Sequence, residues 1–141
     1  MIKLSLSGAD ELHRTLQEMA KKLGKEKTTA ILAEAAKIVT RAVRIFAPKG
    51  PTGNLRRAAY DKGLPVKAWY PAVAIAAMRG RKAPHAHLVE YGTRPRYTKL
   101  GKSTGIMPST PYFSGAWGAV KGQVESHIES RLSEELDEAM K

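Results

Sequence analysis

Apolar residues near the start of the chain recur at helical spacing and predict two helices. Ser7 and Asp10 resemble a capping box, and a stripe with spacings of four, three and four residues then predicts a helix over about 9–23, ended by Gly24. The members of this stripe are Leu12, Leu16, Met19 and Leu23. A second stripe predicts a helix over about 26–46 that ends before Pro48. Its members are Ile31, Ala35, Ile38, Ala42 and Ile45.

A period of two indicates strands at the N-terminus and in the middle of the chain. Residues 2–6 alternate apolar and polar side chains, and residues 55–61 and 66–78 read as strands, with Pro71 marking an edge or a break. Residues 85–91 fit either a short strand or one helical turn, because the periodicity does not decide between them. We therefore expect an antiparallel sheet built from residues 55–91.

Helical spacing returns in the last thirty or so residues. Thr110 suits an N-cap and Pro111 a first helical position, so a helix is predicted over about 111–139, with later turns that are charged and project beyond the core. Its stripe consists of Phe113, Trp117, Val120, Val124, Ile128, Leu132 and Leu136. The preceding residues 92–110 form a loop that is long for so small a domain, which favours either a function or disorder.

The predicted order of elements gives the α+β class. Two N-terminal helices and one long C-terminal helix flank an antiparallel sheet, and 141 residues suit one domain over 1–141. No apolar run approaches the ~18–20 residues needed to cross a bilayer, and we expect no signal peptide and no membrane partner. The absence of cysteine excludes disulfides and thiolate metal sites.

The formal charge of +11 is unevenly distributed along the chain. Residues 61–110 carry nine Lys/Arg and two Asp/Glu, whereas residues 111–141 carry three and six. Such polarity suits a nucleic-acid partner or self-assembly through opposite charges, and a solvated basic surface is the plain alternative. We expect the acidic stretch of one subunit to contact the basic body of a neighbour. The residues of this predicted contact are Glu125, Glu129, Glu134, Glu135, Asp137 and Glu138.

No strong catalytic or metal-binding motif occurs in the sequence. Phosphate-binding loops, nucleophile elbows and zinc-protease motifs are missing, so we expect no enzyme and no cofactor. His85 and His87 form an H-x-H pair without evident further ligands, which favours structural or surface histidines over a metal site.

Two basic loops are the best candidates for binding. They carry seven cations near several aromatic residues, a composition that neutralises phosphates without reading bases, although ordinary packing also explains the aromatics. These cations are Arg79, Arg81, Lys82, Arg94, Arg96, Lys99 and Lys102.

Three segments resemble a family of small tail components of long-tailed bacteriophages, described as head–tail joining or tail-completion proteins. The first is GADELHRTLQEMAKKL after the opening strand. The second is Ala47-Pro48 followed by Thr52-Gly53-Asn54-Leu55-Arg56, and the third is His87-Leu-Val-Glu90-Tyr91-Gly92-Thr93 with the later Pro111-Tyr112-Phe113 and Ala116. Each motif is weak alone, but the three occur in the order seen in the family, and the resemblance covers nearly the whole chain. The chain departs from the family in a longer basic loop over 94–110 and in an extra Gly-Pro at 50–51.

The resemblance implies a structural virion protein without catalytic residues. It implies a homo-oligomeric ring, commonly sixfold, at the head–tail joint or tail terminus, assembled in the bacterial host cytoplasm. Its partners would be the connector and the tail-tube or tail-terminator proteins. In such a ring the two basic loops would face either genomic DNA in the channel or an acidic partner protein. Within the motifs, Glu90 is expected to anchor a nearby Arg or backbone N–H. A sequence-independent nucleic-acid-binding protein is the alternative function, and a small hydrolase or toxin is a distant third.

Overall fold

The computed structural model describes residues 10, 14, 17, 18, 21, 23–64 and 73–141. The predicted strand over 2–6, most of the predicted helix over 9–23 and residues 65–72 lie outside the described residues. The described residues 10, 14, 17, 18, 21 and 23 are helical, and Leu23 packs partly against the core.

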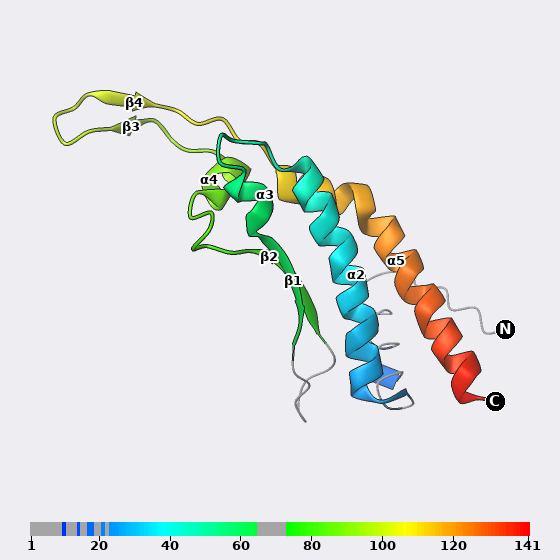
Figure 1. The fold of residues 1–141 in the computed structure, drawn as a ribbon. Coiled ribbons are helices and arrows are strands. Elements are labelled where there is room, and N and C mark those ends of the chain that lie inside the picture. The colour runs from blue at the N-terminus through cyan, green and yellow to red at the C-terminus, as the bar shows by residue number, and fades with distance from the viewer. Residues whose placement is uncertain (1–9, 11–13, 15–16, 19–20, 22, 65–72) are drawn as a thin grey trace.

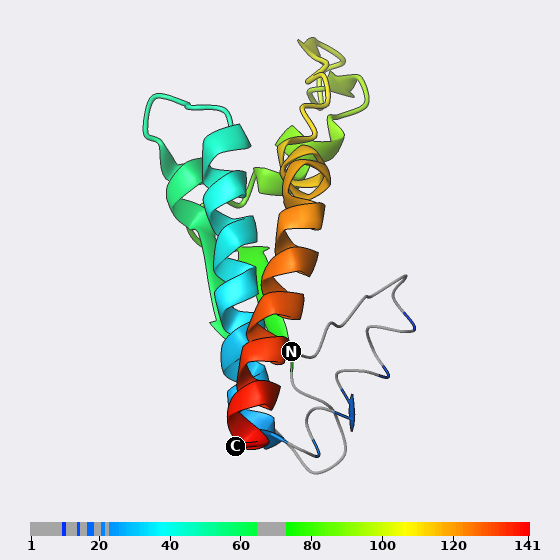
Figure 2. The same ribbon diagram turned by 90° about the vertical axis from the view of Figure 1, so that its right-hand side faces the viewer.

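Two long antiparallel helices form the body of the molecule. Helix α2 (Lys25–Phe46) and helix α5 (Tyr112–Ala139) run side by side over most of their lengths (Figures 1 and 2). The stripe of α2 is buried at Ile31, Ala35 and Ala42, and α5 contributes Leu132, whose side chain is fully enclosed. Apolar burial along this seam accounts for the pairing, since an isolated helix gains little from propensity alone.

A small antiparallel sheet packs against α2. Strands β1 (Ala59–Gly63) and β2 (Ala74–Met78) pair with Asp61 opposite Ala76, and α2 lies between the sheet and α5 in Figure 1. The α+β class predicted from the sequence is confirmed. The sheet is smaller than expected, because only ten of the described residues between 55 and 91 belong to it.

The segments around the sheet contain short helices. Residues 55–61 were predicted as a strand, and this prediction is wrong over its first half: helix α3 (Asn54–Ala58) precedes β1. Gly53, with a φ of 62°, starts that helix, and Leu55 and Ala58 bury one side of its single turn. The ambiguous segment 85–91 is helical, as α4 (Ala86–Tyr91).

The capping of α5 and the packing of its later turns differ from expectation. Thr110 does not cap the helix; Pro111 occupies the N-cap position and makes no side-chain capping bond. The charged later turns do not project beyond the core, because Leu132 and Leu136 are buried against α2. No helix among the described residues is both long enough and apolar enough to cross a membrane.

Candidate functional site: a basic arm and its anchor

Residues 93–110, here called the arm, form a hairpin that projects from one end of the molecule. Strands β3 (Arg96–Tyr97) and β4 (Ser103–Gly105) pair antiparallel, with Arg96 opposite Gly105 and Tyr97 opposite Ser103 (Figure 1). The segment predicted as a long loop, either functional or disordered, is a hairpin between α4 and α5.

A compact turn closes the tip of the arm. The N–H of Thr98 donates to the carbonyl of Lys102 (2.8 Å), and the N–H of Lys102 donates back to the Thr98 hydroxyl (3.1 Å). Gly101 has a φ of 78°, a conformation that favours glycine. Local hydrogen bonds thus define the turn.

The surface of the arm combines positive charge with exposed apolar side chains. The sequence has no Asp or Glu between Tyr91 and Val124, so no carboxylate of the arm balances its cations. Leu100 is 96% exposed, Tyr97 66% and Ile106 64%. The cations Arg94, Arg96, Lys99 and Lys102 are all exposed as well. Exposed apolar groups beside unbalanced cations are typical of a surface that contacts another macromolecule.

Gly92 fixes the point at which the arm leaves α4. Its φ is 73°, and a Cβ at this position would lie 2.8 Å from the Met107 carbonyl oxygen and from the Ser109 nitrogen. The N–H of Thr93 donates to the Met107 carbonyl (2.9 Å), and the Met107 N–H donates to the Thr93 hydroxyl (2.9 Å). Only glycine permits this close approach of the two chain segments at the base of the arm.

Glu90 fastens α4 to the start of α5. Its carboxylate accepts the N–H of Phe113 (2.8 Å), the N–H of Ser114 (3.0 Å) and the Ser114 hydroxyl. Backbone N–H groups in a first helical turn have no partner within the helix, so this carboxylate caps α5 from a distant part of the chain. Glu90 is buried, and the N–H of Thr110 adds a bond to the Val89 carbonyl (2.8 Å).

The ionised state of Glu90 is favoured by these bonds. Burial acts to raise the pKa of Glu90, but the hydrogen bonds from the Ser114 hydroxyl and from the backbone N–H groups outweigh it and lower the pKa below its ordinary value. Burial, together with the nearby Glu90 charge, raises the pKa of Tyr112. The Tyr112 hydroxyl lies 3.4 Å from the carbonyl oxygen of Ala86, which it can reach as a donor.

The second basic loop, around residues 78–83, joins β2 to the segment that leads into α4. The Arg79 guanidinium lies over the Tyr60 ring, 5.1 Å from its centroid, which assigns Arg79 a packing partner within the chain. Arg81 and Lys82 are exposed. Among the described residues, this loop therefore has two exposed cations that do not lie over an aromatic ring. The arm has four exposed cations.

The second sequence motif builds a tight connection between α2 and α3. The Arg56 guanidinium donates to the buried Ala47 carbonyl (2.8 Å), and Leu55 is buried. The carbonyl of Thr52 accepts a bond from Arg57 (2.6 Å). Pro48 and Gly53 lie in the same connection, so this motif shapes the backbone at the end of the molecule that carries the arm.

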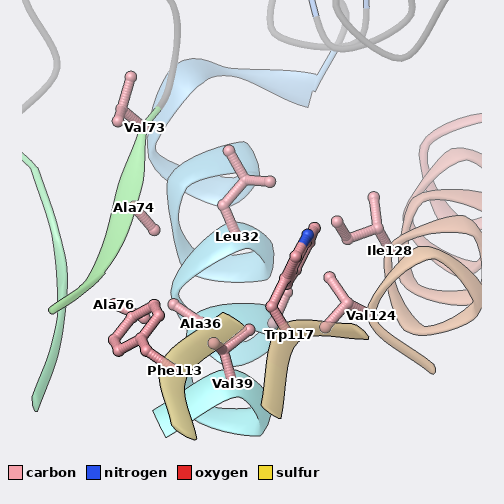
Figure 3. A pocket seen from close by; sticks show the side chains of 11 residues that line it. Leu32, Ala36, Val39, Val73, Ala74, Ala76, Phe113, Trp117, Val124 and Ile128 are labelled. Carbon is pink, nitrogen blue, oxygen red and sulfur yellow. The ribbon is translucent and has the colours of Figure 1, made fainter. Parts of the chain in front are cut away.

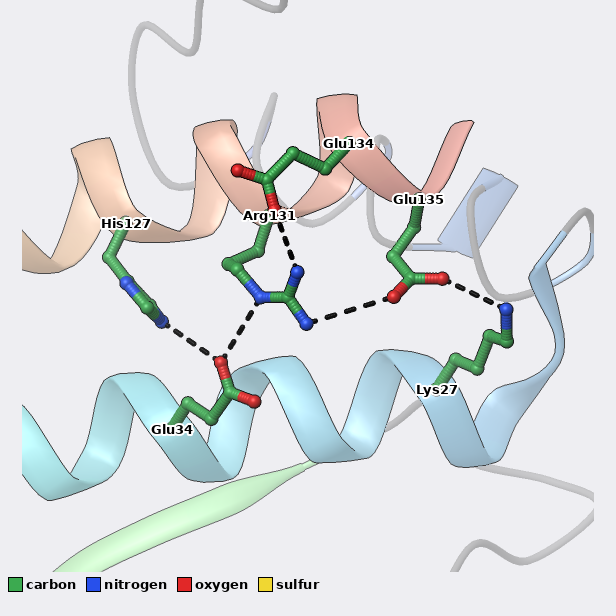
Figure 4. A network of polar contacts seen from close by, with 6 residues as sticks. All are labelled: Lys27, Glu34, His127, Arg131, Glu134 and Glu135. Carbon is green, nitrogen blue, oxygen red and sulfur yellow. Dashed lines mark hydrogen bonds and ion pairs between the residues drawn. The ribbon is translucent and has the colours of Figure 1, made fainter. Parts of the chain in front are cut away.

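The predicted subunit-contact residues on α5 are partly engaged within the chain (Figure 4). Glu135 pairs with Lys27 (2.9 Å), and Glu134 pairs with Arg131 (2.7 Å). Glu34 on α2 joins this network through Arg131 (3.2 Å) and His127 (3.3 Å). Lys27 lowers the pKa of Glu135 mainly through their hydrogen bond. Of the other predicted residues, Glu138 is exposed, whereas Glu125, Glu129 and Asp137 are half-buried.

The histidine pair does not gather ligands. His85 and His87 are exposed, and no group of three or more potential metal ligands occurs among the described residues.

Sequence reasoning located the arm and its cations, and of the two partners expected for Glu90, an Arg or a backbone N–H, the structure shows the backbone N–H. The sequence did not show that these N–H groups belong to the start of α5. The hydrogen bonds that Phe113 and Ser114 donate to Glu90 span more than twenty residues, and no periodicity predicts such a contact. The signal available in the sequence was the Val-Glu-Tyr-Gly-Thr motif, in which an acidic residue lies two positions before a glycine.

Comparison with known protein families, with curated proteins and with solved structures finds no match to this chain.

Proposed function

We propose that this chain is a structural virion protein of a tailed bacteriophage or prophage, forming a homo-oligomeric ring at the head–tail joint or the tail terminus. The observation that carries the proposal is the arm, an ordered hairpin whose apolar side chains are left uncovered by its own subunit. A subunit that assembles with neighbours needs such a surface, because its contacts are completed by another chain. The three motifs that resemble small phage tail components support the same function.

The distribution of charge favours contacts between copies. The arm lies at one end of α5 and the acidic turns lie at the other (Figure 1). A helix of 28 residues is about 42 Å long, so the basic and acidic ends of one copy are far apart. A contact between the basic end of one copy and the acidic end of the next is heterologous, which is the type that closes rings when the rotation permits. In the assembled particle the ring would contact the connector and the tail-tube or tail-terminator proteins.

The test is a virion-joining assay with two charge-matched variants. One replaces the arm cations Arg94, Arg96, Lys99 and Lys102 with Gln, and the control replaces the exposed body cations Lys37, Arg41, Lys49 and Lys121 with Gln. Phage lacking this gene should accumulate separate heads and tails in electron micrographs. We expect the wild type and the control to restore joined particles and the arm variant to fail. Joined particles at normal yield without the gene would contradict the proposal.

The acidic contact has its own test. Truncation after Ser130 is unsuitable, since it removes the buried Leu132 and Leu136 and so damages the fold. Replacing Glu125, Asp137 and Glu138 by their amides removes charge without removing apolar contacts. We expect fewer rings in light scattering and electron microscopy, with wild-type thermal stability. Undiminished ring formation would show that these carboxylates are outside the subunit contact.

Sequence-independent DNA binding is the second candidate function, favoured by the four arm cations without a balancing carboxylate. Each neutralised phosphate contributes about −0.9 to the slope of log affinity against log salt, so the arm variant should lose up to about 3.6 of that slope. The body-cation control should retain most of it. If duplex DNA shows no salt-dependent binding to the assembled ring, the arm contacts protein instead.

A further inference from the structure

Two pockets border the first turns of α5, and they differ in charge. The described side chains that line the first, between β2 and α5, are all apolar (Figure 3). The second, here called the Glu90 pocket, has a volume of about 340 Å³ and contains the buried carboxylate of Glu90 in its lining. Met78, Ala83, Pro84 and Phe113 provide apolar walls around it. This volume lies at the lower end of the range for ligand pockets, so it suits one long side chain.

The charge of Glu90 is only partly balanced within its own subunit. An ionised carboxylate offers about four acceptor sites, and Phe113 and Ser114 fill three of them. The N-terminus of α5 supplies about half a positive charge, and no ion pair among the described residues involves Glu90. The pocket is therefore suited to a cation on an aliphatic stem, because the apolar walls can cover the stem.

The rim of the pocket has the opposite charge. Arg81 and Lys82 belong to the loop whose residues Gly80 and Ala83 line the pocket, and both cations are exposed. This basic rim attracts carboxylates, whereas the interior attracts a cation. A lysine preceded by acidic residues matches both. Lysine fits better than arginine, because a guanidinium fork is matched to two acceptor sites and about one remains on Glu90.

The end of α5 carries this pattern of charges. Asp137 and Glu138 precede Lys141, which is exposed, and the neighbouring Met140 is 70% exposed. Lys141 is far from the pocket of its own subunit, since the pocket borders the start of α5 and a helix of 28 residues is about 42 Å long. A lysine from this segment can therefore enter the pocket only from a second copy.

We propose that Lys141 of one copy enters the Glu90 pocket of the next copy, while the preceding acidic residues pair with the basic rim. The contact rests on the ring proposed above and assigns residues to the junction between its basic and acidic ends. Charge complementarity favours this occupant twice, once inside the pocket and once at the rim. The arrangement is heterologous, because the pocket and the lysine lie at opposite ends of each copy.

The first test titrates the full chain with a fluorescein-labelled peptide of residues 133–141 and follows the fluorescence anisotropy. Lys141→Gln in the peptide should weaken binding about tenfold or more, because a hydrogen bond to a charged partner is lost. Gly80→Leu in the protein should have a similar effect, since it fills the mouth of the pocket and a Cβ at Gly80 meets no atom within 4 Å. Gly122→Leu, at an equally open position on α5 outside the pocket, is the control and should leave the affinity unchanged. Absence of peptide binding, or equal binding in all four combinations, would overturn the proposal.

The second test reverses the charges at the rim. Arg81→Glu with Lys82→Glu in the protein should weaken binding of the native peptide, and a peptide with Asp137→Lys and Glu138→Lys should restore it. If the reversed peptide binds the reversed protein no better than it binds the wild type, the acidic residues do not meet the rim and the contact is wrong.

Electron microscopy of phage particles separates this contact from the ring itself. If Lys141→Gln forms rings at wild-type yield, the contact is wrong and the ring stands. If peptide binding depends on Lys141 and on an open pocket while no ring occurs at the joint, the contact is supported and the ring is wrong.

Discussion

The body and the arm differ in what holds their conformation. In the body, α2 and α5 enclose Leu132 and Val43 completely, and residues more than ninety positions apart form ion pairs. In the arm, short-range hydrogen bonds define the hairpin, while Leu100 at its tip is 96% exposed. Burial of apolar side chains therefore determines the conformation of the body, whereas local hydrogen bonds determine the conformation of the arm.

The largest effect should come from two leucines in opposite environments. Leu132→Ala removes fully buried atoms and leaves a cavity, so the free energy of unfolding should fall by about 2–5 kcal/mol. Leu100→Ala removes exposed atoms and should change it by less than about 0.5 kcal/mol. Urea denaturation followed by circular dichroism measures both. Similar losses in the two variants would mean that the arm tip is packed against the body in solution.

A second comparison concerns two glycines with positive φ. Gly92→Ala forces a Cβ against the Met107 carbonyl and the Ser109 nitrogen, and we expect a loss of about 2–4 kcal/mol from strain and displacement at the arm base. Gly101→Ala has the same backbone strain but open space around its Cβ, so about 1 kcal/mol is expected. The difference in thermal unfolding between the two variants isolates the close approach. Equal losses would show that the base of the arm is loosely packed.

The Glu90 cap should produce an intermediate and pH-dependent effect. Glu90→Gln weakens charge-assisted bonds to Phe113 and Ser114, which should cost about 1–2 kcal/mol at neutral pH. Because the folded-state pKa is lowered, the contribution of Glu90 is fully present above the unfolded pKa, near 4.5. It is lost as the pH falls from there through the lowered folded-state value.

Denaturation between neutral pH and pH 3 measures this contribution. The wild type should lose stability more steeply than Glu90→Gln as the pH falls, so that the two curves converge in acid. Asp61→Asn, at a half-buried carboxylate on β1, is the control and should leave the convergence intact. Parallel curves for the wild type and Glu90→Gln would mean that Glu90 is not a charged cap.

The smallest effect is expected at the exposed end of the ion-pair network. Lys27→Gln removes the nearer of the two cations that pair with Glu135, the other being Arg131, but Lys27 is exposed to solvent, and such pairs contribute little. We expect a small decrease in melting temperature at low salt that disappears at high salt. A large decrease independent of salt would indicate that Lys27 packs through its aliphatic stem rather than through its charge.

The sequence predicts the long helices well, because their apolar stripes are long and regular. The bounds of α2 and α5 differ by one residue at most from those expected, and the α+β class follows. Short elements were harder to predict. Asn54–Ala58 is a single helical turn, and one turn offers too few positions for a period of two to be distinguished from a period of 3.6.

The composition of the arm sets it apart in the sequence, but the sequence does not predict that it forms a hairpin. Four cations and three glycines over 92–110 mark an unusual loop, yet the two strands within it are too short to show alternation. Of its anchor, the sequence predicts that Glu90 binds a backbone N–H or an Arg, but not that the N–H groups are those of Phe113 and Ser114. Glu90, Gly92 and Met107 act through contacts that depend on how α4, the arm and α5 come together.

The paired bonds between Thr93 and Met107 have a consequence for how the chain can vary. They join the two ends of the hairpin, so residues 94–106 form a closed loop that is attached to the body at one fixed point. Lengthening a loop whose ends are already held costs little, since the closure entropy grows only with the logarithm of its length. Residues 94–106 therefore behave as an exchangeable module: a designed hairpin of different length or charge can replace them, while the framework that presents it keeps its fold.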